Sequence, residues 1–342
     1  MSFILGVDTG GTYTDAVILE DEERVIAFSK ALTTHSDLSL GIGLAIQKAI
    51  KKKNTATEKI SLVSLSTTLA TNALVEGQGD RVALVMIGFQ DSDLEKHSIF
   101  DALKGDPFLV IEGGHNYAGF EKSRLAKNKL SKWVSQIKGV SAYAVCSQFA
   151  VRNPEHELEA AEIIRKLTDK PVSLSHQISA KLNGPKRALT AVLNARLIAL
   201  IDLLIIKAEH VIKSLGILAP LMVVRGDGAL ISAAQAREKP IETILSGPAA
   251  SIVGARWLTG ETEAIISDIG GTTTDIAVLK GGKPAIDPRG ASVGPYRTMV
   301  EAVAMYTFGL GGDSEVKLEL EGLGGYISCL LYTSDAADDD HC

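Results

Sequence analysis

Hydrophobic and polar residues alternate over several short segments of this chain, which is the pattern of half-buried β-strands. In the N-terminal third the pattern predicts three strands, an amphipathic helix, and two more apolar strands with a helix between them. The predicted strands cover residues 3–7, 16–20, 24–30, 60–65 and 82–87, and the first predicted helix covers residues 38–53. This order predicts a mixed α/β fold.

A long apolar segment lies in the middle of the chain. Residues 187–215 are apolar on most faces of a helix, which predicts one buried helix. Asn183, Gly184 and Pro185 precede it, and we place a domain boundary there, between residues 1–183 and 184–328. Alternation then resumes with a strand that ends at Val224.

One pattern occurs twice. ILGVDTGGTYTDAVIL at residues 4–19 and AIISDIGGTTTDIAVL at residues 264–279 share Asp, Gly-Gly-Thr, Thr-Asp and a final Leu in register. Each copy predicts a strand, a diglycine turn and a second strand. The duplication predicts two lobes that each contribute to a phosphate site, as in a two-lobed ATPase.

The residues of this hairpin suit phosphate binding. Glycine tolerates positive φ and lacks a Cβ, so a tight turn can bring backbone N–H groups close to an anion. Hydroxyls add donors, and a carboxylate beside phosphate needs a hydrated Mg²⁺ as a bridge. Alternatively each copy is an ordinary β-hairpin, although a turn alone would not require the repeated Asp and Thr positions. The predicted phosphate-binding residues are Gly10, Gly11, Thr12, Thr14, Gly270, Gly271, Thr272 and Thr273, and Asp8 and Asp268 are predicted to hold Mg²⁺ through water.

Composition narrows the class of protein. The chain has 342 residues, is 46% hydrophobic and carries a formal net charge of −6, which becomes about −2 without the four aspartates of residues 329–342. This balance predicts no nucleic-acid partner. Cys146 lies in an apolar strand-like run, which predicts a buried thiol. The longest apolar stretch is interrupted by Asp202, so we expect no membrane span and a soluble, cytoplasmic protein.

The repeated hairpin resembles the actin, sugar kinase and Hsp70 ATPase superfamily, whose two ribonuclease-H-like lobes enclose an interdomain cleft. Within it the chain resembles the A-type subunit of the hydantoinase/oxoprolinase family over residues 3 to about 325. The segments that carry this resemblance are DTGGTYTDAV, STTLATNALVEGQGDRVALVMIGF, RALTAVLNARL, and the stretch from VVRGDGALIS through ILSGPAAS to GLGGDS.

The resemblance implies an ATP- and Mg²⁺-dependent enzyme that phosphorylates and opens a cyclic amide of the hydantoin, N-methylhydantoin or 5-oxoproline type. It also implies a B-type partner subunit and an oligomeric assembly. Asp15 and Asp275 would brace the hairpins or orient water. Thr67, Thr68 and Asn72 follow a buried strand, where ligands bind in α/β folds, although either threonine could simply cap a helix. Arg225 and Asp227 would contact substrate or phosphate, or form a solvated turn.

Some positions depart from the family pattern. Ser66 stands where glycine is usual, and Arg225, Gly226, Asp227 and Gly228 replace an Asn-Gly-Gly element. Residues 329–342 resemble translated sequencing adapter, so we expect a non-native tail that takes the place of a later adenosine-binding element. Alternatively, these residues form a natural acidic, disordered terminus, since four aspartates among small residues fit that composition. Two other functions stay open: an ATPase that reactivates or activates another enzyme, and a small-molecule kinase. The activator would need cysteines that bind a metal cluster, and Cys146 alone cannot supply them.

Overall fold

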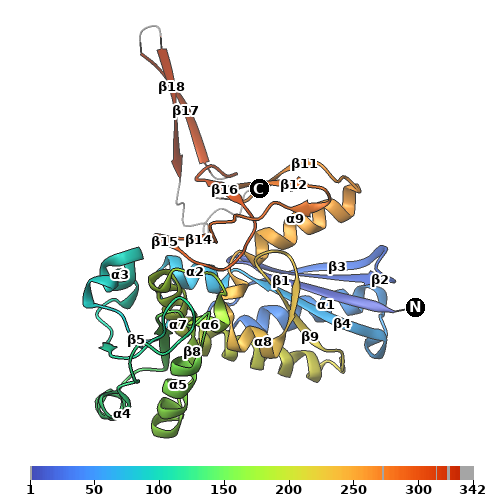
Figure 1. The fold of residues 1–342 in the computed structure, drawn as a ribbon. Coiled ribbons are helices and arrows are strands. Elements are labelled where there is room, and N and C mark those ends of the chain that lie inside the picture. Colours follow the sequence, from blue (N-terminus) through green and yellow to red (C-terminus); the bar gives the residue numbers. More distant parts are fainter. Residues whose placement is uncertain (1, 272, 313, 322–323, 332–342) are drawn as a thin grey trace.

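The first sheet holds the N-terminal hairpin at its centre. The computed structural model describes residues 2–271, 273–312, 314–321 and 324–331 (Figure 1). The strand order is β10-β9-β4-β1-β2-β3; β4 is parallel to β1, β9 is parallel to β4, and the other neighbours are antiparallel. The strands are β1 (Phe3–Thr9), β2 (Tyr13–Glu20), β3 (Arg24–Leu32), β4 (Ile60–Thr67), β9 (Leu221–Val224) and β10 (Leu230–Ser232). The predicted N-terminal strands are confirmed.

Helix α1 (Leu38–Lys53) packs on β2 and β3. It starts where the Asp37 side chain accepts a hydrogen bond from the Ser39 N–H, and it ends at Asn54 in the left-handed conformation. Ile42, Ala45, Ile46 and Ala49 form its buried face, at the predicted helical spacing. Helix α2 (Leu69–Val75) follows β4 directly, and the 3₁₀ helix η1 (Thr57–Lys59) precedes β4.

A second sheet is inserted between β4 and β9. Its four parallel strands, in the order β6-β5-β7-β8, are β6 (Phe108–Ile111), β5 (Val82–Ile87), β7 (Ala142–Ser147) and β8 (Val172–Leu174). The predicted strand at residues 82–87 is therefore confirmed as β5, but it opens a separate sheet, and β9 pairs with β4 instead. The helices around it are η2 (Asp91–Ser98), α3 (Ile99–Leu103), α4 (Lys127–Gln136), α5 (Glu155–Thr168) and α6 (Ser175–Ile178).

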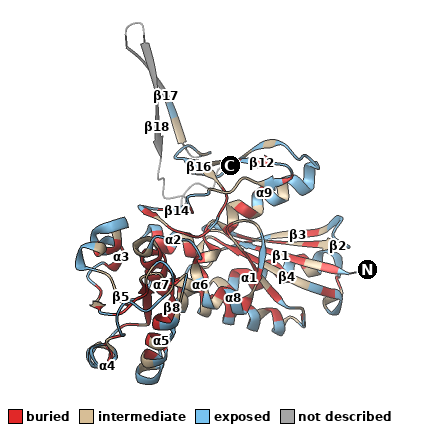
Figure 2. Cartoon of the chain, in the orientation of Figure 1, coloured by how far each residue is buried: buried red, intermediate tan, exposed pale blue. Residues whose placement is uncertain are grey.

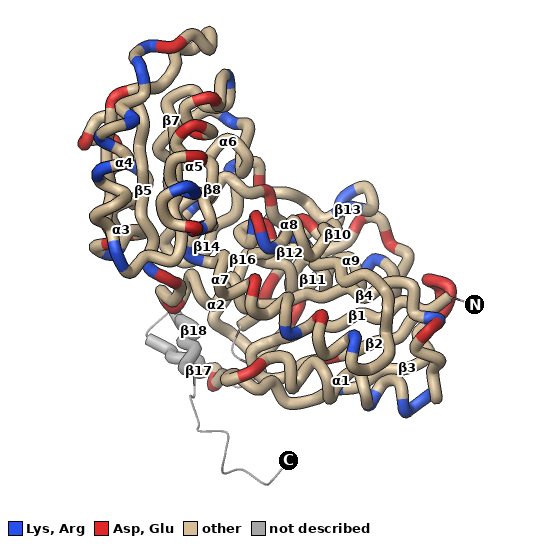
Figure 3. Tube along the Cα trace, turned by 90° about the horizontal axis from the view of Figure 1, so that it is seen from below, with Lys and Arg blue, Asp and Glu red and all other residues tan. Residues whose placement is uncertain are grey.

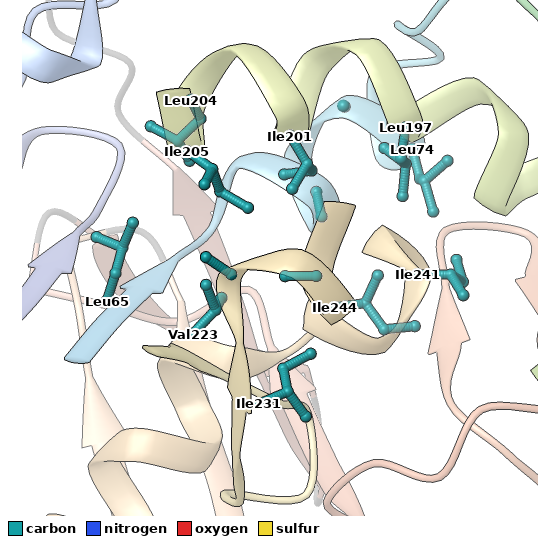
Figure 4. Packing of buried hydrophobic residues seen from close by; sticks show 14 of the residues in the cluster. Leu65, Leu74, Leu197, Ile201, Leu204, Ile205, Val223, Ile231, Ile241 and Ile244 are labelled. Carbon is teal, nitrogen blue, oxygen red and sulfur yellow. The ribbon is translucent and has the colours of Figure 1, made fainter. Parts of the chain in front are cut away.

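Helix α7 (Gly184–Ser214) connects the two sheets. It packs on β5, β7 and β8 of the second sheet and on α1, α2 and α8 (Ala233–Glu238) beside the first. Figure 4 shows its residues Leu197, Ile201 and Leu204 in one core with Leu65 and Val223. By length and composition α7 could cross a membrane, yet 67% of its most apolar window is buried in the protein. The buried residues along it in Figure 2 are those of a core helix.

The C-terminal part carries the second hairpin. Strand β12 pairs with β11, β13 and β16, and helix α9 packs against β11 and β12 while also contacting β4 and β9. Figure 1 shows α9 between this sheet and the first one. The elements are η3 (Pro240–Thr243), α9 (Ser246–Thr259), β11 (Ala264–Ile269), β12 (Thr274–Lys280), β13 (Lys283–Pro284), β14 (Ser292–Val293), β15 (Tyr296–Arg297), β16 (Met305–Phe308), β17 (Ser314–Glu321) and β18 (Gly324–Leu331).

The predicted boundary at residues 183–184 coincides with the start of α7. Strands β9 and β10 lie beyond it in sequence but complete the first sheet, so that sheet uses residues from both sides of the boundary. The first residues of the predicted tail, 329–331, pair with 314–316 in the β17–β18 hairpin, and residues 332–342 lie outside the described residues.

Candidate functional site

Asp8 lies near the end of β1, at the start of the first hairpin. In the sheet register it lies between Asp15 of β2 and Ser66 of β4. The buried Ser66 hydroxyl donates a hydrogen bond to Asp8 Oδ1, and Asp8 keeps contact with solvent although protein atoms crowd its carboxylate. The sheet thus holds this carboxylate from one side and leaves it accessible.

The second hairpin repeats this geometry. Asp268 of β11 lies opposite Asp275 of β12, as Asp8 lies opposite Asp15. The Gly10 N–H donates to the Tyr13 carbonyl at 3.0 Å, and the Gly270 N–H donates to the Thr273 carbonyl at 2.8 Å. The sequence repeat is therefore a structural repeat.

The glycines of the first hairpin turn let other atoms come close to the backbone, and they do not adopt unusual backbone angles. Among the described residues of the first turn, neither Gly10 nor Gly11 has positive φ, so the expectation that positive φ tightens this turn is wrong. A Cβ at Gly10 would lie 3.2 Å from the Tyr13 carbonyl oxygen, and a Cβ at Gly11 would meet no atom within 4 Å. The turn therefore has an open surface that a ligand can approach. Gly271 is exposed.

The threonine hydroxyls of the two hairpins differ in their exposure to solvent. Thr12 and Thr273 are exposed, and Thr273 lines the cavity described below. Thr14 is fully buried, and its hydroxyl lies 3.0 Å from that of Thr33, which also donates to the Gly10 carbonyl at 2.9 Å. Thr14 thus supports the turn from inside the lobe, and its predicted phosphate contact remains a prediction. Thr272 lies outside the described residues.

The second carboxylate of each hairpin contacts the next strand. Asp15 pairs with Lys30 of β3 at 3.6 Å, and the Thr307 hydroxyl of β16 donates to Asp275 at 2.6 Å. These contacts tie each hairpin to its third strand. Bracing is one of the two roles predicted for Asp15 and Asp275, and both roles remain predictions.

The charge of Asp268 acts on the carboxylate of Asp8 across the two lobes. The pKa of Asp8 is raised, first because surrounding protein removes hydration from its carboxylate; the Ser66 hydrogen bond opposes this, and the charges of Asp15 and Asp268 raise the pKa further. A divalent cation would remove this repulsion. Two carboxylates, with water and phosphate oxygens completing the shell, are a usual Mg²⁺ environment, so these residues fit that ion.

We therefore expect Asp8→Asn to raise the melting temperature at pH 7 in the absence of Mg²⁺, because a raised pKa means that the charged form of Asp8 opposes folding. A carboxyl whose pKa is raised by folding stabilises the fold only at low pH and loses that contribution as the pH rises through the folded-state pKa. The gain should shrink as the pH falls through the raised folded-state pKa and vanish below the ordinary carboxyl pKa of about 4. Thermal denaturation followed by circular dichroism at several pH values would measure it, and a lower melting temperature for the variant at pH 7 would contradict the assignment.

A cavity of about 860 Å³ lies beside the second hairpin. Its wall combines α2, the start of α9, the second hairpin and the loop around β14 and β15. The polar residues that line it are Thr68, Thr71, Asn72, Thr273, Asp275, Asp287, Arg289, Ser292, Arg297 and Thr307. This volume is of the size that small-molecule sites have.

The three residues predicted after β4 take different positions. Thr68 and Asn72 line the cavity, and the Asn72 amide donates to the Thr68 hydroxyl at 3.3 Å. Thr67 is buried, and its hydroxyl accepts a hydrogen bond from the Leu69 N–H at 3.1 Å. Thr67 therefore has the capping contact of the alternative interpretation. Ser246, at the start of α9, donates to the Thr67 carbonyl at 2.9 Å and joins the two helix starts.

Comparison with known proteins identifies the family of this chain. The family model described as the hydantoinase/oxoprolinase N-terminal region matches residues 4–168, and the model described as hydantoinase/oxoprolinase matches residues 187–324.

The chain belongs to the hydantoinase/oxoprolinase family.

Two curated relatives in this family are named as subunits. The chain is 29% identical to caprolactamase subunit alpha of Pseudomonas jessenii, over 93% of this chain and 49% of the relative. It is 26% identical to the acetophenone carboxylase gamma subunit of Aromatoleum aromaticum, over 93% and 48%. The crystal structure of the ATP-dependent caprolactamase from Pseudomonas jessenii matches with a TM-score of 0.78 and 27% identity, over 91% of this chain and 48% of that one. The chain thus spans about half the length of these proteins. The structural match confirms the predicted actin-like ATPase fold.

At one departure from the hydantoinase/oxoprolinase pattern the structure shows an ion pair. Arg225 donates to both carboxylate oxygens of Asp227, with 3.0 Å between Arg225 Nε and Asp227 Oδ1. Partial burial would raise the pKa of Asp227, but the hydrogen bonds from Arg225 and the Ala229 N–H lower it overall. Neither side chain lines the large cavity, so contact with substrate or phosphate remains a prediction for both.

Sequence reasoning missed several residues of the site. Ser66 was noted only as a departure from glycine, yet it binds Asp8. Arg289 and Arg297 follow the second hairpin in the segment around β14 and β15, which has no recognisable motif, and Thr307 lies on a strand that no pattern predicted. The weak available signal was the Asp-Pro-Arg-Gly run at residues 287–290, which is typical of a turn.

Proposed function

We propose that this chain is the ATP-using subunit of an enzyme that opens a cyclic amide ring. The observation that carries the proposal is the structural repeat of the two hairpins, each with facing carboxylates beside a diglycine turn, together with a cavity of substrate size that the second hairpin lines. The ATP-dependent caprolactamase relative supports both the use of ATP and the amide substrate.

The chemistry requires ATP because an unstrained amide is a poor electrophile. Transfer of the γ-phosphoryl group to the amide oxygen releases ADP and makes the amide carbon electrophilic. Water adds to that carbon, the C–N bond breaks as a proton passes to the ring nitrogen, and a second water hydrolyses the resulting acyl phosphate to carboxylate and phosphate. Asp8 and Asp268 would hold Mg²⁺, which neutralises charge on the transferred group, and the diglycine turns would bind phosphate through backbone N–H groups. Thr68 and Asn72 would orient the substrate in the cavity.

The proposal includes a partner subunit. The named relatives are subunits of larger enzymes, and we propose a B-type subunit that completes hydrolysis. Figure 3 shows acidic and basic residues interspersed along the described chain, which supports a small-molecule substrate rather than nucleic acid. A cytoplasmic location is part of the same proposal.

An activator of another enzyme fits the described residues less well. Cys146 is fully buried in β7, its thiol donates to the Gly184 carbonyl at 3.3 Å, and burial raises its pKa to about 12. Such a thiol is not available as a cluster ligand. The acetophenone carboxylase relative favours a second candidate, an ATP-dependent carboxylase subunit.

The test is ATP turnover by this chain together with a B-type subunit. We expect hydantoin, 5-oxoproline or caprolactam to raise ADP release by at least about tenfold, with one ring opened per ADP, since remote binding energy is used to position the reacting groups. Acetophenone with bicarbonate serves as the comparison for the carboxylase candidate. ADP release that is indifferent to every cyclic amide would overturn the proposal.

A further inference from the structure

Two arginines and one aspartate form a cluster on the wall of the cavity. Asp287, Arg289 and Arg297 all line it, on the segment that runs from just after β13 to the end of β15. We call these three residues the arginine cluster. No residue of the two hairpins belongs to the arginine cluster. The cluster is therefore a separate polar part of the cavity wall.

Asp287 holds both guanidinium groups. Its Oδ1 accepts hydrogen bonds from the Arg289 N–H at 2.9 Å and from Arg289 Nε at 3.2 Å, and its Oδ2 accepts from Arg289 Nη2 at 3.2 Å and from Arg297 Nη1 at 2.9 Å. Arg297 Nη1 also donates to the Gly290 carbonyl at 3.1 Å. Asp287 is mostly buried, with 18% of its side chain exposed. Arg297 is therefore fixed by two acceptors before any ligand arrives.

The arginine cluster carries excess positive charge. One carboxylate serves two guanidinium groups, and these bonds hold the pKa of Asp287 far below its usual range. Lys186 lies beside the cluster, with Nζ donating to the Arg289 carbonyl at 2.6 Å. The pKa of Lys186 is lowered, first by partial burial and then by the charges of Arg297 and Lys181. An anion would relieve this repulsion between cations.

Donors remain available for such an anion. Within the described part of the chain, Arg297 Nε and Nη2 make no hydrogen bond. A ligand can reach them, because 39% of this side chain is exposed. Val75, Val293 and Met305 line the same cavity. An apolar surface beside a guanidinium edge suits a small organic acid, because the guanidinium fork matches a planar carboxylate.

We propose that Arg297, positioned by Asp287 and supported by Arg289, binds a carboxylate carried by the cyclic amide, so that the site selects acidic rings over uncharged ones. This inference rests on the proposed function and narrows its substrate class. A phosphoryl group is the competing anion, but the proposed function assigns phosphate to the backbone N–H groups and hydroxyls of the hairpins, whereas the arginine cluster lies on a different segment beside apolar side chains.

The test compares two rings that differ only in the carboxylate, 5-oxoproline and 2-pyrrolidinone. Calorimetric titration into this chain with its B-type subunit should give an affinity for 5-oxoproline about ten- to a hundredfold higher, which is the range for hydrogen bonds to a charged group. Arg297→Gln should abolish this preference while leaving the affinity for 2-pyrrolidinone and for ATP-Mg²⁺ unchanged. Arg24→Gln is the matched control, because Arg24 is also exposed and paired with a carboxylate, that of Glu20, but lies outside the cavity.

Each outcome decides a separate point. Equal affinity of the unaltered protein for the two rings would overturn the carboxylate assignment and leave ring opening intact. A preference that survives in Arg297→Gln would also overturn it. Weaker ATP-Mg²⁺ binding by Arg297→Gln would assign the arginine cluster to phosphate instead. If neither ring binds while hydantoin or caprolactam raises ATP turnover, this inference alone fails. If no cyclic amide raises ATP turnover, the proposed function fails together with it.

Discussion

Replacing Asp8 or Asp268 by asparagine should lower the rate of ATP hydrolysis by about a hundredfold or more, because charge stabilisation in the transition state dominates phosphoryl transfer. Asparagine keeps the size of the side chain and can still accept the Ser66 hydrogen bond at position 8. It removes the charge that Mg²⁺ requires. The measurement is steady-state ADP release by this chain with the proposed B-type subunit, over a series of Mg²⁺ concentrations.

Asp91→Asn is the matched control, since Asp91 is exposed and begins η2, outside the cavity. It should leave turnover unchanged. Unaltered turnover in both Asp8→Asn and Asp268→Asn would eliminate the Mg²⁺ assignment. If Asp8→Asn proves at least as stable as the unaltered protein at pH 7, as expected, unfolding does not account for a loss of activity in that variant.

Replacing Arg196 by methionine should destabilise the protein by about 3–5 kcal/mol, since breaking a buried ion pair leaves its partner without compensation. Arg196 Nη2 donates to Asp106 Oδ2 at 2.7 Å, and both side chains are about 95% buried. The guanidinium also donates to the carbonyls of Asp80, Ala102 and Leu103. Removing it would leave these acceptors unpaired where α7 meets the second sheet. Urea denaturation followed by tryptophan fluorescence would measure the change.

Lys207→Met provides the comparison on the same helix. Lys207 pairs with Asp37 at 3.0 Å, but both side chains are about one-third exposed. Such pairs contribute about 0–1 kcal/mol. If the two variants lost equal amounts of stability, the buried network around Arg196 would not be what holds α7 against the second sheet.

The buried polar residues of α7 show what an apolar sequence pattern can and cannot predict. Apolar periodicity correctly predicted one long buried helix, but it did not explain the polar positions within it. Asn194 donates to Ser173 and to the Glu238 carbonyl and accepts from the Ile241 N–H, so it joins three segments that are distant in sequence. Arg187 donates to the Ser147 and Lys181 carbonyls and to Ser175. Their partners are known only once the chain is folded.

The sequence by itself determined the two hairpins, because their strands, turns and carboxylates are local and occur twice in the same register. It also determined the mixed α/β class, since helical and strand periodicities depend on neighbouring residues alone. Only the tertiary structure decided that β9 rather than β5 pairs with β4, that Ser66 binds Asp8, and that Arg297 shares a cavity with Asp275. The physical reason is that strand order and cavity walls depend on contacts between distant segments, which no local pattern specifies.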